Sequence, residues 1–233
     1  MGTIIDDPRL RDRRFVFSDR HDAGRQLGEL LRSLPALKDP IVLAIPAGGV
    51  PIGAEIARAI HAAFALAVVR KLQIPGNTEA GFGAVTWDGR VLINDLLQKA
   101  LGLKKSEIDA AIRATRENVS DRVARFTGGR PFPAVADKTV ILADDGLASG
   151  FTMLAAIQSI REMNPAQIIV AVPTASRSSA DSVATNADKL ICLNIRTGGR
   201  FAVAEAYKRW YDLSDNEVLA ELSFFRSGKK ESS

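Results

Sequence analysis

The chain has 233 residues, 46% of them hydrophobic and 25% charged, which is typical of a soluble globular protein with one α/β domain. Its formal net charge of +4 suits an anionic small ligand and is too small to indicate a nucleic-acid partner. The sequence has no signal-peptide pattern, no membrane-spanning apolar run and a single cysteine, Cys192. We therefore expect a cytoplasmic protein with no internal disulfide and no membrane partner.

Residues 1–17 are basic and irregular, so we expect a surface arm held by Phe15 and Phe17. Ser18 or Asp19 can cap a following helix, whose apolar residues recur at helical spacing between residues 23 and 34. His21 falls in the first turn of this helix. We interpret it as a surface histidine rather than a catalyst.

The first buried strand is predicted over residues 41–45, an unbroken apolar run. The turn Pro46-Ala47-Gly48-Gly49-Val50-Pro51 follows it, and a helical pattern begins at Ile52. Such a glycine turn exposes backbone N–H groups at the carboxyl end of a strand and at a helix N-terminus. These groups favour an anion.

Residues 65–70 predict a further strand that ends in the basic pair Arg70-Lys71. At the rim of a parallel sheet this pair could contact an anionic ligand, and the alternative is ordinary surface charge. A glycine-rich stretch follows, and Asp88-Gly89 predicts a hairpin turn between residues 83–86 and 90–93. We expect this segment to be a lid or a binding loop.

Two helices are predicted next, one over residues 95–101 and a longer one from Ser106. The longer helix carries Arg113 and Arg116 outside its apolar stripe. Charges in this position usually lie on a solvated face, and spacing alone leaves open whether these two point to a site.

The most informative stretch is residues 140–152. A buried strand over residues 139–143 leads into Asp144 and Asp145, and a loop of mostly small residues then opens the next helix. The loop residues are Gly146, Leu147, Ala148, Ser149, Gly150, Phe151 and Thr152. Backbone N–H groups and the helix dipole favour a phosphate here, so the two carboxylates must face a sugar diol, a divalent cation or both. The competing interpretation is a plain Asp-Asp-Gly turn. Walker and dinucleotide-binding fingerprints are both absent from the sequence.

Buried strands over residues 167–172 and 189–193 flank a short helix, and Cys192 lies in the second of them. Strands that alternate with helices at this rhythm predict an α/β fold with a doubly wound, mostly parallel sheet flanked by helices. The aromatic residues Tyr207, Trp210 and Tyr211 precede a helix that Ser214 and Glu217 can cap. These aromatics either anchor the C-terminal segment to the core or stack on a planar ligand.

The motif over residues 140–152 resembles the 5-phosphoribosyl 1-diphosphate (PRPP) binding motif of type I phosphoribosyltransferases, and the similarity runs over most of the chain. This resemblance implies one domain over residues 1–226, with a core at about 36–195. It also implies a hood, a cover over the sheet, from about 1–35 and 200–226, a flexible hairpin loop, and a disordered tail at 227–233.

The resemblance also implies roles for individual residues. Asp144 and Asp145 would hold the ribose hydroxyls and help to place Mg²⁺, which prefers oxygen ligands. Residues 146–152 would cradle the 5′-phosphate, with hydroxyl donors from Ser149 and Thr152. The pyrophosphate would meet Ala47, Gly48, Gly49 and the charge of Lys71. Asp144, Asp145 and Lys71 would be the catalytic residues.

The sequence departs from this pattern at Ala47, where the branch that the chain resembles usually has arginine. Two hypotheses follow, an enzyme that transfers the phosphoribosyl group to a nitrogen nucleophile such as a nucleobase, and a non-catalytic regulatory protein that senses PRPP or a nucleotide. A different sugar-phosphate enzyme on a similar sheet is a third. The acceptor is not identified, and a homodimer is expected from the frequency of such assemblies.

Overall fold

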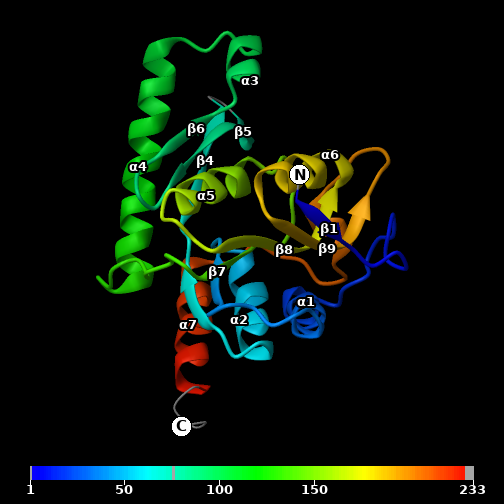
Figure 1. Ribbon diagram of the computed structural model, residues 1–233. Coiled ribbons are helices and arrows are strands. Elements are labelled where there is room, and N and C mark those ends of the chain that lie inside the picture. The colour runs from blue at the N-terminus through cyan, green and yellow to red at the C-terminus, as the bar shows by residue number, and fades with distance from the viewer. Residues whose placement is uncertain (1, 75–76, 229–233) are drawn as a thin grey trace.

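The computed structural model describes residues 2–74 and 77–228 and has a six-stranded sheet at its centre (Figure 1). The strand order is β1-β9-β8-β7-β2-β3, and every neighbouring pair is parallel. The strands are β1 (Thr3–Ile5), β2 (Ile41–Ala44), β3 (Ala63–Leu66), β7 (Thr139–Ala143), β8 (Gln167–Ser176) and β9 (Lys189–Arg196). The prediction of a mostly parallel α/β sheet is confirmed.

Helices cover both faces of this sheet, which explains why its central strands are apolar along their whole length. Helices α1 (Arg20–Ser33) and α2 (Gly49–Ala59) lie on one face, and α5 (Phe151–Arg161) and α6 (Arg177–Asn186) lie on the other (Figure 1). In β7, Ile141 packs into the core on the α1 and α2 side, whereas Val140 and Leu142 pack into the core on the α5 and α6 side. The doubly wound arrangement follows from this alternation.

The remaining elements form a smaller layer and a C-terminal cover. An antiparallel sheet of β4 (Val69–Ile74), β5 (Asn77–Thr86) and β6 (Val91–Ile93) projects with α3 (Asp95–Ala100) and α4 (Lys105–Thr127) at the top of Figure 1. The 3₁₀ helix η1 (Val203–Ala206) and the helix α7 (Asp215–Gly228) complete the chain, and α7 packs against α2. The predicted hairpin is confirmed, because Gly83 pairs with Ile93 in antiparallel register.

The predicted strand over residues 65–70 is wrong in one respect, because it is two strands in different sheets. β3 ends at Leu66, and the Ala67 N–H donates to the Ala44 carbonyl at 2.9 Å as the chain leaves the main sheet. β4 then pairs with β5. Apolar composition continues through the break, so the sequence carries no local signal for it.

Two other boundaries differ from expectation. The segment predicted as an irregular arm contains β1, which pairs with Lys189–Ile191 at the edge of the main sheet. β8 continues through Pro173 to Ser176, four residues beyond the predicted end at residue 172. Helix α7 continues to Gly228, so the tail expected to be disordered from residue 227 is helical at residues 227 and 228, and its remainder from residue 229 lies outside the described residues.

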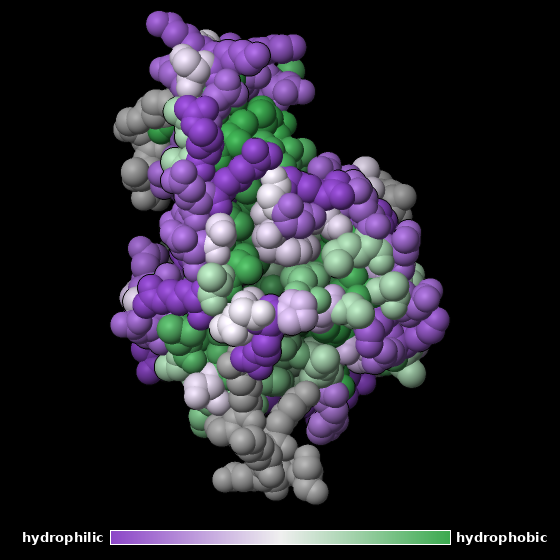
Figure 2. Space-filling model, turned by 90° about the vertical axis from the view of Figure 1, so that its left-hand side faces the viewer, coloured by the Kyte–Doolittle hydropathy of each residue, from purple (hydrophilic) through white to green (hydrophobic). Residues whose placement is uncertain are grey.

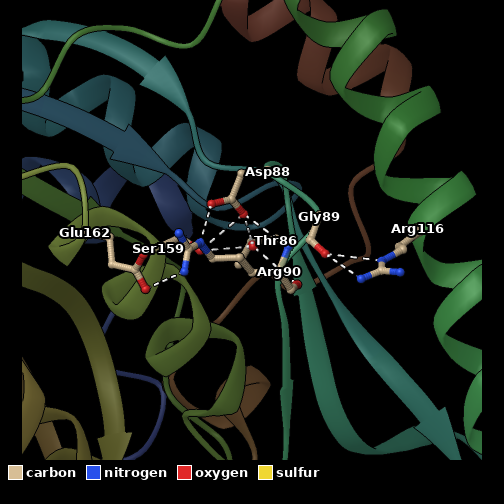
Figure 3. Close-up of polar contacts among 7 residues, drawn as sticks. All are labelled: Thr86, Asp88, Gly89, Arg90, Arg116, Ser159 and Glu162. Atoms are coloured by element: carbon tan, nitrogen blue, oxygen red, sulfur yellow. Dashed lines mark hydrogen bonds and ion pairs between the residues drawn. The ribbon is translucent and has the colours of Figure 1, made fainter.

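The turn of the β5–β6 hairpin is fixed to helices on two sides by a polar network (Figure 3). On the α5 side, the buried Ser159 hydroxyl donates to the Thr86 hydroxyl at 3.0 Å, and Arg90 bridges Asp88 and Glu162. Thr86 in turn donates to the Asp88 carboxylate. This network holds the turn against the helix that starts at residue 151.

On the α4 side, the guanidinium of Arg116 donates to the Gly89 carbonyl at 3.1 and 3.2 Å (Figure 3). Arg116 therefore supports the hairpin turn, a role that differs from both the solvated face and the site contact considered for it from the sequence.

Figure 2 shows the side of the molecule that carries α4, hydrophilic at its upper end with apolar side chains gathered across its middle. An apolar cavity of about 410 Å³ runs beside the edge strand β3 and is lined in part by Phe64, Phe126, Phe132 and Phe225. None of the described helices is both long and apolar enough to cross a bilayer.

Candidate functional site

A cavity of about 470 Å³ lies between the two sheets, where β7 ends and α5 begins. One wall is formed by Asp144 and by every residue from Gly146 to Met153. The opposite wall comes from the smaller sheet and α3, through Lys71, Gly81, Gly83 and Leu97. The structure thus brings the predicted loop and Lys71 to one cavity, although they belong to different sheets.

Asp144 is the member of the acidic pair that lines this cavity. Its Oδ1 accepts a hydrogen bond from the Asp145 backbone N–H at 2.8 Å, which fixes the side chain at the end of the strand. Burial, together with the nearby charge of Asp145, raises the pKa of Asp144 well above its usual range. A cation or a set of hydroxyl donors in the cavity would relieve this unfavourable charge.

Asp145 turns away from the cavity, toward the turn after β2. A Cβ atom added to Gly48 would lie 1.8 Å from Asp145 Oδ2, so the carboxylate occupies the space beside that glycine. The same Oδ2 accepts a hydrogen bond from Arg20 Nε at 2.9 Å, and the Asp145 side chain is only 16% exposed. Burial raises the pKa of Asp145, and the positive charge of Arg20 opposes that rise.

The loop after the acidic pair is held from behind by the neighbouring strand and helix. Leu147 is buried, and its N–H donates to the Thr174 carbonyl at 2.9 Å. The Ala148 carbonyl accepts a hydrogen bond from the Ser179 hydroxyl at the start of α6. Gly150 has a positive φ of 76° and directly precedes α5, a conformation that glycine adopts at little cost. The loop therefore presents its backbone to the cavity at the positive end of a helix.

The Gly48-Gly49 turn packs tightly on the end of β7. A Cβ atom on Gly49 would lie 2.5 Å from the Ala143 carbonyl oxygen and 2.9 Å from the Asp144 Cα atom. Only glycine allows the start of α2 to approach the acidic pair this closely. The peptide bond between Pro46 and Ala47 is cis. The glycine turn after β2 and the acidic pair after β7 thus lie side by side.

Lys71 lies inside β4, opposite Ala84 of β5, and not at the end of a strand of the parallel sheet. It reaches the cavity because the smaller sheet folds over the loop that follows β7. The sequence predicted Lys71 at the rim of the parallel sheet, and this reason is wrong, because Lys71 belongs to the antiparallel sheet.

Arg20 was not predicted to lie at the site, whereas for Tyr207 and Trp210 the sequence left open anchoring of the C-terminal segment or stacking on a planar ligand. Arg20 is 6% exposed and contacts Asp145 from the first turn of α1. The Tyr207 hydroxyl donates to the Asp145 backbone carbonyl at 2.6 Å, and Trp210 lies under the Arg20 guanidinium. The aromatic residues of the C-terminal segment were noted in the sequence, but nothing local connects them or Arg20 to residues more than 60 positions away.

His21 is more than a surface histidine, because it joins three helices. Nδ1 lies 3.0 Å from Glu55 of α2, and Nε2 lies 3.0 Å from Glu221 of α7. The hydrogen bonds to Glu221 and Glu55 raise the pKa of His21 to about 9 from an ordinary 6.5. The charged imidazolium thus links the C-terminal helix to the two helices that start beside Asp145.

A pH-dependent stability follows for this histidine. Because the folded-state pKa is raised, the stabilisation is complete below pH 6.5 and is lost as the pH rises through about 9. For a ring that is 38% exposed, we expect roughly 1 kcal/mol after solvent screening. Urea unfolding of the wild type and of His21→Gln, at about pH 6 and at about pH 10, measures this contribution to the free energy of unfolding.

The control variant for this measurement is His61→Gln, at a histidine that is exposed. A constant difference between wild type and His21→Gln over the same range would contradict the assigned ion pairs.

Known proteins are similar to this chain along most of its length. The family model "Phosphoribosyl transferase domain" matches residues 21–206. A relative from Mycobacterium tuberculosis (strain ATCC 25618 / H37Rv), named "Putative phosphoribosyl transferase Rv0571c", is 35% identical over 207 residues. That alignment covers 89% of this chain and 46% of the relative. The chain therefore spans about half the length of the curated relatives that it matches.

Solved structures are similar to this chain in fold. The protein TT1426 from Thermus thermophilus superposes with a TM-score of 0.73 at 31% identity, over 90% of this chain and 98% of that one. AQ2163 from Aquifex aeolicus superposes with a TM-score of 0.50 at 11% identity, over 81% and 78% of the two chains, and shows the fold alone. On the strength of the family model and the sequence identity, the chain belongs to the phosphoribosyl transferase domain family.

Proposed function

We propose that the chain binds PRPP with Mg²⁺ and transfers the phosphoribosyl group to a nitrogen nucleophile, with a nucleobase as the leading candidate. One observation carries this proposal. Asp144, the loop that follows the acidic pair and the N-terminus of α5 line a single cavity, and Lys71 lies in its opposite wall. Phosphate groups of a ligand in this cavity would meet backbone N–H groups and a cation, and its hydroxyls would meet Asp144.

Asp144 fits a magnesium ion that the substrate would also help to hold. No group of three or more His, Cys, Asp or Glu side chains among the described residues is arranged to hold a metal ion by itself. Mg²⁺ commonly binds one or two carboxylates, keeps several waters and takes its remaining ligands from substrate phosphates. When bound, the ion would neutralise the leaving diphosphate. Asp144 faces the cavity in which that ligand set would form.

In the proposed reaction the bond between the ribose anomeric carbon and pyrophosphate breaks as the bond to the acceptor nitrogen forms. The transition state resembles an oxocarbenium ion. The tasks of this chain are to orient the partners, to hold the phosphates and to exclude water. Residues 146–152 would hold the 5′-phosphate, the turn from Ala47 to Gly49 would offer backbone groups to the pyrophosphate, and Lys71 would balance its charge.

The second candidate function is a regulatory protein that binds the same kind of ligand without catalysing a reaction. Ala47 places a methyl group at the turn next to Gly48, and a methyl group adds no positive charge for pyrophosphate. A protein with this site could bind PRPP or a related nucleotide and regulate a partner without catalysis.

Pyrophosphate release separates the two candidates. We expect release from PRPP in the presence of Mg²⁺ with at least one member of a panel of nucleobases and amines, and at least about tenfold weaker PRPP binding after chelation of the metal. Calorimetry measures the binding. Tight PRPP binding without release with any acceptor would favour the regulatory protein. Absence of PRPP binding would contradict the enzyme, and absence of binding of both PRPP and related nucleotides would contradict both candidates.

A further inference from the structure

We propose that Arg20 is a positioning residue, which fixes Asp145 against the Gly48 turn and thereby sets the geometry of the acidic pair for its ligand. This inference rests on the proposed function, since the ligand concerned is PRPP with Mg²⁺. It extends that function to a residue that lies 125 positions from Asp145.

Two hydrogen bonds fix the orientation of the Arg20 guanidinium. Its Nε donates to Asp145 Oδ2 at 2.9 Å, and one terminal nitrogen donates to the Tyr211 carbonyl at 2.8 Å. The planar guanidinium has a rigid fork of donors, so two such bonds fix its orientation as well as its charge. Arg20 is 6% exposed, and the ion pair is therefore weakly screened by water.

The aromatic rings of Trp210 and Tyr207 also hold Arg20 and Asp145 in place. The guanidinium carbon lies 3.9 Å from the centroid of the Trp210 ring, within the range of a cation–π contact. Trp210 packs on Tyr207 with ring centroids 5.2 Å apart, and the Tyr207 hydroxyl holds the Asp145 backbone carbonyl. The C-terminal segment thus supports Asp145 at its backbone directly and at its carboxylate through Arg20.

Arg20 acts through Asp145 rather than on the ligand cavity itself. The lining of the 470 Å³ cavity includes Asp144, whereas Arg20 lies behind Asp145 and lines a separate cavity of about 640 Å³ under Trp210 and Tyr211. The Asp145 Oδ2 atom that fills the space beside Gly48 is the same atom that accepts the hydrogen bond from Arg20. Without Arg20, the carboxylate loses the side-chain donor that holds Oδ2, and the glycine turn and the acidic pair are no longer held in alignment.

The test compares Arg20→Gln with Arg196→Gln. Arg196 is also 6% exposed, pairs with Glu205 at 2.6 Å and lies 5.5 Å from the Phe201 ring, so it matches Arg20 in burial and in the type of its partners. We expect Arg20→Gln to weaken Mg²⁺-dependent PRPP binding about tenfold or more, and Arg196→Gln to change it less than about twofold. Arg20→Lys, which keeps the charge but not the fork, should recover part of the loss.

A double-variant cycle with Asp145→Asn then distinguishes positioning from general structural support. If Arg20 acts through Asp145, the double variant binds PRPP no more weakly than Asp145→Asn alone. Additive losses, equal losses in Arg20→Gln and Arg196→Gln, or wild-type affinity in Arg20→Gln would each overturn the proposal. If Arg20→Gln does not fold, Arg20→Lys and the double variant, in which Gln and Asn replace the ion pair, decide the matter. Failure of the wild type to bind PRPP would instead remove the proposed function, and this inference with it.

Discussion

Replacing Gly48 by alanine is expected to weaken Mg²⁺-dependent PRPP binding by about tenfold to a hundredfold while leaving the protein folded. The backbone of Gly48 has φ −60° and ψ −34°, which alanine adopts freely, so the effect is purely steric. The new methyl group would meet Asp145 Oδ2 at 1.8 Å and force that carboxylate out of its place. Calorimetry with PRPP and Mg²⁺ measures the loss.

Two other glycines provide the comparison. The methyl group of Gly49→Ala would meet the backbone of Ala143 and Asp144, which cannot move aside, so this variant should lose about 3 kcal/mol of folding stability. Gly198→Ala meets no atom within 4 Å and should change neither stability nor binding. Wild-type PRPP affinity in Gly48→Ala would show that the position of Asp145 beside the turn does not matter to the ligand.

Asp144→Asn is expected to bind PRPP and Mg²⁺ at least about a hundredfold more weakly and yet to unfold at higher urea concentration than the wild type. Burial and the Asp145 charge raise the pKa of Asp144, so its ionised form costs folding free energy at neutral pH. Asparagine removes that charge and keeps an oxygen that can accept the Asp145 N–H. We expect a gain in stability on the order of 1 kcal/mol.

The sign of this effect can be checked with pH. An acid whose pKa is raised by folding destabilises the protein as the pH rises above its ordinary value of 3.8, so the advantage of Asp144→Asn should shrink on acidification. Asp121→Asn, on the exposed side of α4, should leave both binding and stability unchanged. An Asp144→Asn variant that is less stable than the wild type at every pH would show that the carboxylate is compensated in the free protein.

Much of the main sheet was predictable because strands buried on both faces are unbroken apolar runs. The runs at residues 41–45 and 139–143 coincide with β2 and β7 to within one residue. β1 was missed because it has only three residues. It forms a strand by pairing with β9, which lies more than 180 positions away in the sequence. The division between β3 and β4 was missed because both sides of the break are apolar.

Some residues of the candidate site could likewise be predicted from the sequence, and others could not. Asp144 and the loop to Thr152 are consecutive, so their shared cavity could be inferred from local chemistry. Arg20 occupies a helix position at which arginine usually faces solvent, and only the packing of the C-terminal segment buries it. The separate surroundings of Asp144 and Asp145 were likewise hidden, because neighbouring carboxylates look equivalent in a sequence.

The anchored hairpin turn bears on how this protein can be labelled. An Asp-Gly turn is ordinarily a good place to insert a peptide tag or a fluorescent reporter, since loop tips tolerate additions. Here the turn at residues 88–89 is held by α5 and α4, and α5 begins at the loop that lines the ligand cavity. An insertion at this turn would act on the helix behind that loop. The Gly198-Gly199 turn, where added side-chain atoms would meet nothing within 4 Å, is the better position for a probe.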